Sequence, residues 1–341
     1  MTPERSTQDL AQLHDRTLGC LLGGLIGDAM GRPAENKTYK EIEAAFGRIT
    51  DFSGSGTDDS ALKHLLCDAI LRTGGRVTAA AWADEWLRQE DLFIKRGLFW
   101  TPVMNAFWKV RAEGVPPDEA GNGNMASSSS AMCISPLGII NAADPGRAYR
   151  EAFAAASLIH HNFCRDAAAM MAAAVAAAMA ADATVESVLG QAVAHLPPDV
   201  SGVMRASTAA TVRLARETGE YAAFRARFYD ELMLPRVAAA DSRETVPVAL
   251  ALFMLAGGDP RESVIMGANF GRDTDTIASM AGALAGAFRG ASALPPEWAS
   301  KAAAGSGRDQ EALSRALVAI ARSRGSGLEA GPFAAPPGAL H

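Results

Sequence analysis

The sequence predicts an all-α fold. Apolar residues recur at helical spacing through most of the chain, helix-capping and helix-ending residues separate these runs, and no stretch shows convincing strand alternation. Of the 341 residues, 49% are apolar and 21% are charged, so enough apolar side chains are available for a sizeable core. We expect one all-α domain over residues 1–324, followed by a disordered tail over residues 325–341.

The composition also excludes several classes of protein. A net charge of −6 and a pI near 5.6 argue against nucleic-acid binding. The four cysteines are scattered without a C-x-x-C pair, so we interpret them as reduced thiols. The apolar runs 18–30 and 167–181 are shorter than the ~20 residues of a membrane span, and the polar N-terminus lacks the order of a signal peptide. We therefore expect a cytoplasmic protein that binds no membrane, and the oligomeric state stays open.

The first predicted helix follows a capping signal at Ser6 and Thr7 and ends at residues 31–33. Three glycines interrupt it, namely Gly23, Gly24 and Gly27. Each costs up to ~1 kcal/mol relative to alanine inside a helix. Their presence indicates close backbone packing or the close approach of a ligand.

Similar signals predict the remaining helices. They are expected over residues 39–46, from 58 onward, 78–86, 101–114, 145–160, from 165 onward, 185–195, 202–218, 221–233, 246–256, 260–269, 277–288 and 308–323. Residues 116–140 read as a long loop, and loops of that length are usually functional or disordered. Gly282 and Gly286 lie one turn apart and predict a small-residue seam for tight packing.

Acidic residues gather in two short motifs, each directly before a helix. Residues 271–276 read Gly-Arg-Asp-Thr-Asp-Thr, and residues 56–60 read Gly-Thr-Asp-Asp-Ser. Within a continuous helix Asp273 and Asp275 would point about 200° apart, so they converge only in a loop or a first helical turn. Four carboxylates that met there would repel one another unless cations lay between them. The alternative is that each motif is only a solvated helix cap.

The two motifs together offer a set of hard oxygen ligands. The candidate metal ligands are Thr57, Asp58, Asp59, Asp273, Asp275 and Thr276. Oxygen ligands suit Mg²⁺, Mn²⁺ or Ca²⁺ better than zinc, and no EF-hand calcium loop is present. A two-metal site of this kind would suit hydrolysis of a phosphate ester, a peptide or a glycoside, and the ligands alone do not choose among them.

Four motifs in order resemble the ADP-ribosylglycohydrolase family over residues 15–290. They are DRTLGCLLGGLIGDAMGRPAE, GTDDS, the interrupted series GNG, SAM and PLG, and GRDTDTIASMAGALAGA. The resemblance implies a compact multi-helix orthogonal bundle that binds two Mg²⁺ or Mn²⁺ ions. It also implies cleavage of the bond between the ribose anomeric carbon of ADP-ribose and its acceptor.

The resemblance also implies roles for individual residues. The six candidate ligands above would hold the metals, Glu35 would lie at the mouth of the site, and the candidate catalytic residues are Glu35, Asp58 and Asp273. The candidate substrate-binding residues are Gly121, Asn122, Gly123, Met132, His160 and Arg272. Arg272 replaces a common glycine, so it could touch a phosphate or simply pair with a carboxylate.

The chain departs from the family pattern in its substrate loop. Cys133 follows Ala131 and Met132 where an arginine is common, which weakens the case for a protein-linked ADP-ribosyl substrate. The serine run 127–130 lengthens this loop and reads either as a flexible linker or as a source of backbone donors for phosphate. Phe93, Phe99 and Trp100 could stack on a base, although core packing is the favoured interpretation.

The leading hypothesis is a dimetal-dependent hydrolase that uses a metal-activated water to cleave the N- or O-glycosidic bond of an ADP-ribosyl or ribosyl group. Its partner would be an ADP-ribosylated protein or a small riboside. One alternative is a glycosidase that acts on a small-molecule riboside or another glycoside. A second alternative is a non-catalytic, ligand-binding relative.

Overall fold

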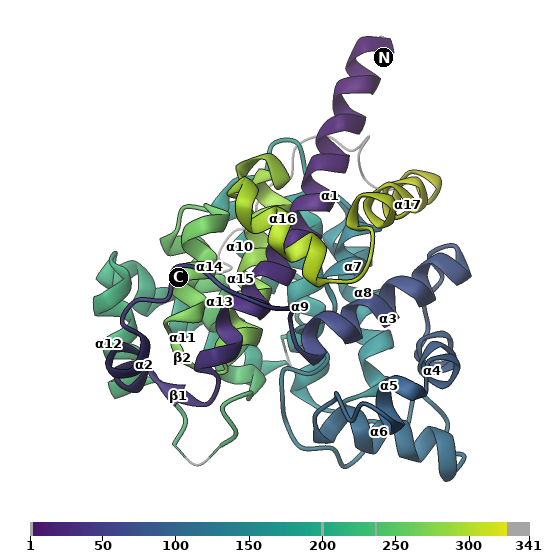
Figure 1. Ribbon diagram of the computed structural model, residues 1–341, viewed down its shortest axis with the longest axis horizontal. Coiled ribbons are helices and arrows are strands. Elements are labelled where there is room, and N and C mark those ends of the chain that lie inside the picture. The colour runs from purple at the N-terminus through teal and green to yellow at the C-terminus, as the bar shows by residue number, and fades with distance from the viewer. Residues whose placement is uncertain (1–2, 199–200, 236, 326–341) are drawn as a thin grey trace.

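The computed structural model describes residues 3–198, 201–235 and 237–325 (Figure 1). Within these ranges the chain forms seventeen α-helices and a single pair of two-residue strands, so the predicted all-α fold is confirmed. The predicted disordered tail lies outside the described residues from residue 326 onward. That residues 1–324 form one domain stays a prediction.

The elements follow one another along the whole chain. In the first half they are α1 (Pro3–Gly31), β1 (Lys37–Thr38), α2 (Tyr39–Phe46), α3 (Asp58–Thr73), α4 (Ala79–Arg88), α5 (Asp91–Ile94), α6 (Thr101–Ala112), α7 (Ser135–Ile139), α8 (Pro145–Ala155) and α9 (Phe163–Ala178). In the second half they are α10 (Val185–Ala194), α11 (Gly202–Thr218), α12 (Tyr221–Glu231), α13 (Ser242–Leu255), α14 (Pro260–Ala268), β2 (Gly271–Arg272), α15 (Thr274–Arg289), α16 (Pro296–Gly305) and α17 (Gln310–Ser323). Short 3-10 helices follow α1, α8 and α15 at Arg32–Ala34, Ala156–Leu158 and Ala291–Ala293.

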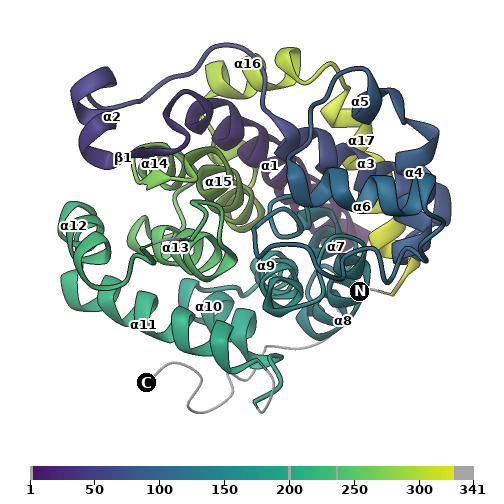
Figure 2. The same ribbon diagram turned by 90° about the horizontal axis from the view of Figure 1, so that it is seen from below.

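Helices α1 and α15 lie side by side in the middle of the bundle (Figure 2). Every fourth residue of α1 from Gly19 onward is a glycine, and a Cβ on any of them would clash with the backbone of α15. Gly23 faces Gly282, and Gly19 faces Gly286. The predicted small-residue seam is therefore confirmed, and the two helices run antiparallel along it. As a result, the C-terminal end of α1 lies against the first turn of α15.

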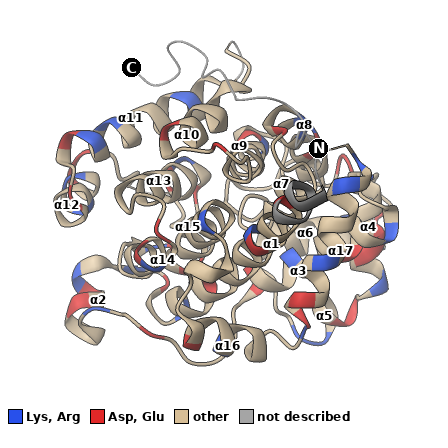
Figure 3. Ribbon diagram, turned by 90° about the horizontal axis from the view of Figure 1, so that it is seen from above, with Lys and Arg blue, Asp and Glu red and all other residues tan. Residues whose placement is uncertain are grey.

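The alanine-rich helix α9 is buried along most of its length, as the sequence predicts. Its small side chains let α7, α8, α10 and α15 contact it. None of the described helices is long and apolar enough to cross a membrane. Lys and Arg alternate with Asp and Glu over the outer helices (Figure 3).

The prediction of a loop over residues 116–140 is correct as far as Ile134, since this part lies in no helix or strand, but it is wrong over α7 (Ser135–Ile139). The segment contains helix α7 and a series of turns, and residues 127–140 are buried without exception. Its polar residues look like those of a loop, but the hydroxyl groups of the serines at 127–130 form hydrogen bonds inside the molecule. Burial of a polar group costs little free energy when the group has such partners.

Several helix boundaries also differ from the predictions. The first helix begins at Pro3 and passes through the expected cap, α13 begins at Ser242 instead of 246, and α15 begins at Thr274 instead of 277. The side chain of Asp241 accepts a hydrogen bond from the backbone N–H of Arg243, which caps α13 well before Pro247. The sequence analysis did not anticipate α5, α16 or the two strands.

Candidate metal centre

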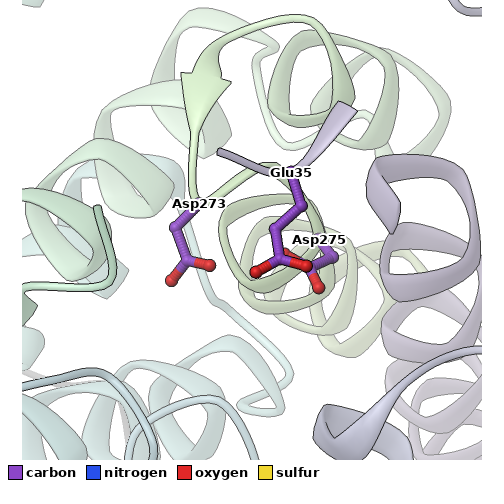
Figure 4. Close-up of side chains that lie close together, drawn as sticks. All are labelled: Glu35, Asp273 and Asp275. Atoms are coloured by element: carbon purple, nitrogen blue, oxygen red, sulfur yellow. The ribbon is translucent and has the colours of Figure 1, made fainter. Parts of the chain in front are cut away.

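Three carboxylates meet where the end of α1 reaches the start of α15. Glu35, Asp273 and Asp275 each offer one oxygen atom, and these atoms lie within 4.8 Å of one another. Figure 4 shows the three side chains pointing into the same space. Glu35 is exposed, whereas Asp273 and Asp275 are buried. The structure thus brings the glutamate loop to the second acidic motif.

Backbone pairing holds the glutamate loop in this place. Strands β1 and β2 are antiparallel, with Lys37 opposite Arg272, and the backbone N–H of Asn36 donates to the carbonyl of Arg272 over 2.7 Å. Asn36 has a φ of 62° and donates from its side chain to Glu35 Oε1 over 3.0 Å. A left-handed conformation is tolerated best by glycine and asparagine. The same loop therefore turns sharply and orients the glutamate.

The first acidic motif is held by Asp28, a residue that the sequence analysis did not assign to the site. Asp28 is fully buried and accepts hydrogen bonds from the backbone N–H groups of Thr57 and Ser60 at 2.8–3.0 Å. It also accepts from the hydroxyl of Thr57 at 2.9 Å and from that of Ser60 at 2.5 Å. The sequence feature that could have identified Asp28 is its position as a single carboxylate inside an apolar helical segment. A side chain from α1 thereby caps the N-terminus of α3.

The two acidic motifs touch each other directly. The hydroxyl of Thr276 donates to Asp59 Oδ2 over 3.3 Å, so the first turn of α15 contacts the first turn of α3. One oxygen on each side of this contact, Asp59 Oδ1 and Asp275 Oδ1, is buried and has no hydrogen-bond partner among the described residues. Buried polar atoms in native proteins nearly always have a partner, and the exceptions call for an unseen ion or water.

Burial and mutual repulsion raise the pKa of all four aspartates. Burial comes first in each case, and the pKa of Asp59 and that of Asp275 rise well above the ordinary value. Neighbouring carboxylates add to these shifts, with Asp28 acting on Asp59 and Asp273 acting on Asp275. The pKa of Asp58 rises to about 6 and that of Asp273 to about 7. Without a cation, the site therefore favours protonated carboxyl groups.

These residues fit one or more hard divalent cations. All the candidate ligand atoms are oxygens, and two of them lack a hydrogen-bond partner. A bound cation would also remove the repulsion between carboxylates that raises the pKa of Asp59 and that of Asp275. Thr57 is less available as a metal ligand than predicted, because its hydroxyl already donates a hydrogen bond to Asp28. Asp58 is half-buried at the edge and accepts from the backbone N–H of Trp100 over 3.2 Å.

The serine run 127–130 is ordered and buried, so its interpretation as a flexible linker is wrong. The hydroxyl of Ser128 donates to Asp273 Oδ2 over 3.0 Å, and this bond lowers the pKa of Asp273 against the effect of burial. The backbone N–H of Ser128 donates to the carbonyl of Ala240 over 2.7 Å, so it is not free to bind phosphate. The serine run was singled out in the sequence, but the contact between the Ser128 side chain and Asp273 was not predicted.

His160 is fully buried behind this serine run. Its Nε2 lies 3.0 Å from the hydroxyl of Ser127 and its Nδ1 lies 2.8 Å from that of Ser130. Burial lowers its pKa to about 3, so the ring is neutral near pH 7. Both ring nitrogens are thus used to hold the loop.

The remaining predicted substrate-binding residues differ in exposure. Gly121 is buried against the backbone of His160, and Met132 is 5% exposed. Asn122 and Gly123 are exposed, and the adjacent Asn124 side chain ties this turn to the carbonyl of Pro102 over 2.9 Å. Cys133 is fully buried, and burial raises the pKa of its thiol.

Arg272 pairs with a carboxylate, the second of its two predicted roles. Its guanidinium donates to both oxygens of Glu244, with Nε at 2.9 Å and Nη2 at 3.1 Å. Such a two-pronged pair fixes both side chains. The pair therefore ties β2 to the first turn of α13.

The aromatic residues near α6 divide into core and surface. Phe93 and Phe99 pack together in the core with ring centroids 4.3 Å apart, as predicted. Trp100 is 38% exposed, and its side chain makes no hydrogen bond or ring contact with another described residue. Its backbone N–H donates to Asp58, so the main chain at Trp100 lies beside the first acidic motif.

A cavity of about 490 Å³ adjoins the first acidic motif on its other side. Its lining includes Thr57, Ser60 and Arg308 but none of the four aspartates or Glu35. The cavity and the carboxylate cluster therefore share the turn at residues 56–60 and are otherwise separate.

Comparisons with known proteins agree with the all-α fold. The family model described as ADP-ribosylglycohydrolase matches residues 9–327. The uncharacterised protein YegU of Escherichia coli is 29% identical over 307 residues, which cover 83% of this chain and 90% of the relative. A solved structure named as an ADP-ribosylglycohydrolase-related protein complex covers 92% of this chain and 99% of its own, with a TM-score of 0.65 at 22% identity.

Two further relatives have names that state an activity. The ADP-ribosylarginine hydrolase Tri1 of Pseudomonas putida is 25% identical over 323 residues, covering 89% of this chain and 76% of the relative. The ADP-ribosyl-[dinitrogen reductase] glycohydrolase of Rhodospirillum rubrum is 24% identical over 306 residues, covering 85% and 90%. With the family model spanning nearly the whole chain, the fold and the paired acidic motifs identify this protein as a member of the ADP-ribosylglycohydrolase family.

Proposed function

We propose that the chain is a dimetal-dependent hydrolase that cleaves the N- or O-glycosidic bond of an ADP-ribosyl or ribosyl group. The observation that carries this proposal is the pair of unpartnered, buried oxygens, Asp59 Oδ1 and Asp275 Oδ1, where the two acidic motifs meet. The names of the Pseudomonas and Rhodospirillum relatives support a substrate of the ADP-ribosyl class.

Two Mg²⁺ or Mn²⁺ ions are the proposed cofactors. The residues that would hold them are Thr57, Asp58, Asp59, Asp273, Asp275 and Thr276. When bound, such ions lower the pKa of a water molecule and hold a reacting oxygen. Asp28 and Ser128 would orient the ligands, since they bind Thr57 and Asp273 through their side chains.

The chain's own carboxylates would handle the charge and the protons. As the glycosidic bond breaks, positive charge develops on the sugar ring, and the carboxylates of Asp59, Asp273 and Asp275 would stabilise it. Glu35 is exposed at the edge of this group and would accept a proton from the attacking water. Asp58 is half-buried at the edge of the group, where it accepts a hydrogen bond from the backbone N–H of Trp100, and it is the candidate for protonating the leaving group.

A small riboside is the second candidate substrate. The observation that favours it is the pair between Arg272 and Glu244, which occupies the cation that could otherwise bind a diphosphate. Cys133, buried where the family often has arginine, supplies no replacement charge. The exposed ring of Trp100 would stack on a nucleobase or another planar leaving group.

Activity assays on the metal-loaded chain test the proposal. Release of ADP-ribose from ADP-ribosylarginine and release of ribose from small ribosides would be measured with Mg²⁺ and with Mn²⁺. We expect hydrolysis of one class, and we expect Asp275→Ala to lose several orders of magnitude in kcat/KM. The matched control is Asp182→Ala, because Asp182 is exposed in the connection between α9 and α10, and this variant should stay fully active. Full activity of Asp275→Ala, or no hydrolysis of either class by the native chain, would overturn the proposal.

A further inference from the structure

Lys63 is a buried lysine that the proposed reaction does not use. It lies in α3 one turn after Asp59 and is 1% exposed. Its ammonium donates to the hydroxyl of Ser279 over 3.3 Å, and no carboxylate of the described residues forms an ion pair with it. An isolated charge in a protein interior is strongly unfavourable unless other charges compensate it.

A specific place is built for this ammonium between three helices. A Cβ on Gly24 of α1 would clash with Lys63 Nζ, so the missing side chain of this glycine leaves the space that the ammonium fills. Ser279 of α15 supplies the hydrogen bond from the opposite side. The sequence showed Gly24 as an unexplained cost in the first helix, and Lys63 accounts for it.

On each of the three helices a residue of the acidic site lies one turn from the residue beside this ammonium, and two of these three residues are aspartates. One turn separates Gly24 from Asp28 in α1, Lys63 from Asp59 in α3, and Ser279 from Thr276 in α15. Since Thr276 donates to Asp59 and Ser60 donates to Asp28, the upper layer is continuous. A helical turn rises about 5.4 Å, so the backbone at Lys63 lies roughly that far along α3 from the backbone at Asp59. Charges that are buried in neighbouring layers, as Lys63 and Asp59 are, interact more strongly than charges in water.

We infer that Lys63 is a fixed counter-cation that stabilises the carboxylate layer without metal and weakens the binding of divalent ions to it. This inference rests on the proposed metal centre. The ammonium attracts the carboxylates that the metals also attract, and it repels the metals themselves. Its removal should therefore tighten metal binding and at the same time destabilise the metal-free chain.

The test replaces Lys63 by methionine, which keeps the length of the side chain and removes the charge. Mn²⁺ alone would be titrated into the metal-stripped chain by calorimetry. We expect Lys63→Met to bind Mn²⁺ roughly tenfold more tightly than the native chain. The matched control is Lys95→Met, because Lys95 is 71% exposed and pairs only with Asp91, and its affinity should not change. Equal or weaker Mn²⁺ binding by Lys63→Met would overturn the inference.

Thermal unfolding provides an independent test of the role of Lys63. Lys63→Met should lower the melting temperature of the metal-free chain more than that of the Mn²⁺-loaded chain, whereas an equal loss in both would mark a purely structural role. Asp59→Asn removes a matching negative charge, so the double variant Asp59→Asn/Lys63→Met should lose less stability than the two single losses combined. Additive losses, or a double variant that does not fold, would contradict charge compensation. This arm measures no hydrolysis, so a failed activity assay leaves it intact.

Discussion

The two acidic motifs contain similar residues but are held in different ways. At residues 56–60 a single side chain, Asp28, accepts the hydrogen bonds that fix the turn. At residues 271–276 the main chain fixes the turn, through the pairing of β2 with β1 and through a hydrogen bond from the Thr274 hydroxyl to the carbonyl of Gly31 at 2.8 Å. The first motif should therefore be sensitive to one side chain, and the second to the spacing between α1 and α15.

The largest expected effect on stability comes from a change in the spacing between α1 and α15. Gly23→Ala would place a methyl group against the carbonyl of Gly282 and force α1 and α15 apart. We expect a loss of about 3 kcal/mol in the free energy of unfolding, the upper end of typical overpacking. Gly190→Ala in α10 is the matched control, because nothing lies within 4 Å of its added Cβ, and it should stabilise by up to ~1 kcal/mol. Equal denaturation midpoints for the two variants would contradict the claim that α1 and α15 need glycines to pack closely.

Asp28→Asn should disrupt the first motif and leave the second in place. The amide nitrogen cannot accept the hydrogen bonds that the carboxylate receives, so Thr57 and Ser60 lose part of their support. We expect Mn²⁺ affinity to fall by about 10–100-fold, as when a supporting partner of a metal ligand is removed. A titration by calorimetry measures this change. An unaltered affinity would show that Asp28 serves only the fold.

Ser128→Ala tests the support of the second motif by a side chain. Loss of the hydroxyl removes the hydrogen bond that lowers the pKa of Asp273, so more protons must leave before a metal binds. We expect roughly tenfold weaker Mn²⁺ binding at pH 6.5 and a smaller loss at pH 8. Ser129→Ala, whose hydroxyl contacts Ser127 and no carboxylate, is the control. Identical pH profiles for both variants would rule out this role of Ser128.

The smallest expected effect is the response of stability to pH. Asp58 and Asp273 have folded pKa values of about 6 and about 7, above the ~3.9 of an unfolded aspartate. Between pH 4 and 7 the folded chain therefore binds more protons than the unfolded chain, and stability falls as the pH rises. The melting temperature of the metal-free chain should drop by a few degrees from pH 5 to pH 8, and saturating Mg²⁺ should remove the drop. A metal-free melting temperature that rises over this range would contradict these pKa values.

The sequence predicted the parts of the site that lie in local motifs. Asp58, Asp59, Asp273 and Asp275 could be named because each pair directly precedes a helix, and Glu35 because its loop resembles that of a family. Most of the helices followed from apolar spacing, and the seam from glycines one turn apart. These signals need only a few consecutive residues.

Other features depend on contacts between distant segments, which spacing does not encode. Asp28 is an ordinary helix residue until the N-terminus of α3 packs against it, and Lys63 looks like a surface charge in an amphipathic helix. The serines at 127–130 read as a loop because their partners, Asp273 and His160, lie far away in the chain. Arg272 left two interpretations open until Glu244 was located beside it.

The central claim is that both acidic motifs contribute to one metal centre. Its most direct test is Mn²⁺ binding by the native chain, Asp59→Asn and Asp275→Asn, because these variants change one motif each and leave the side-chain volume unchanged. We expect two Mn²⁺ ions per native chain and a loss of at least tenfold in affinity for either variant. Undiminished Mn²⁺ binding by one variant would show that its motif lies outside the centre and would contradict the account.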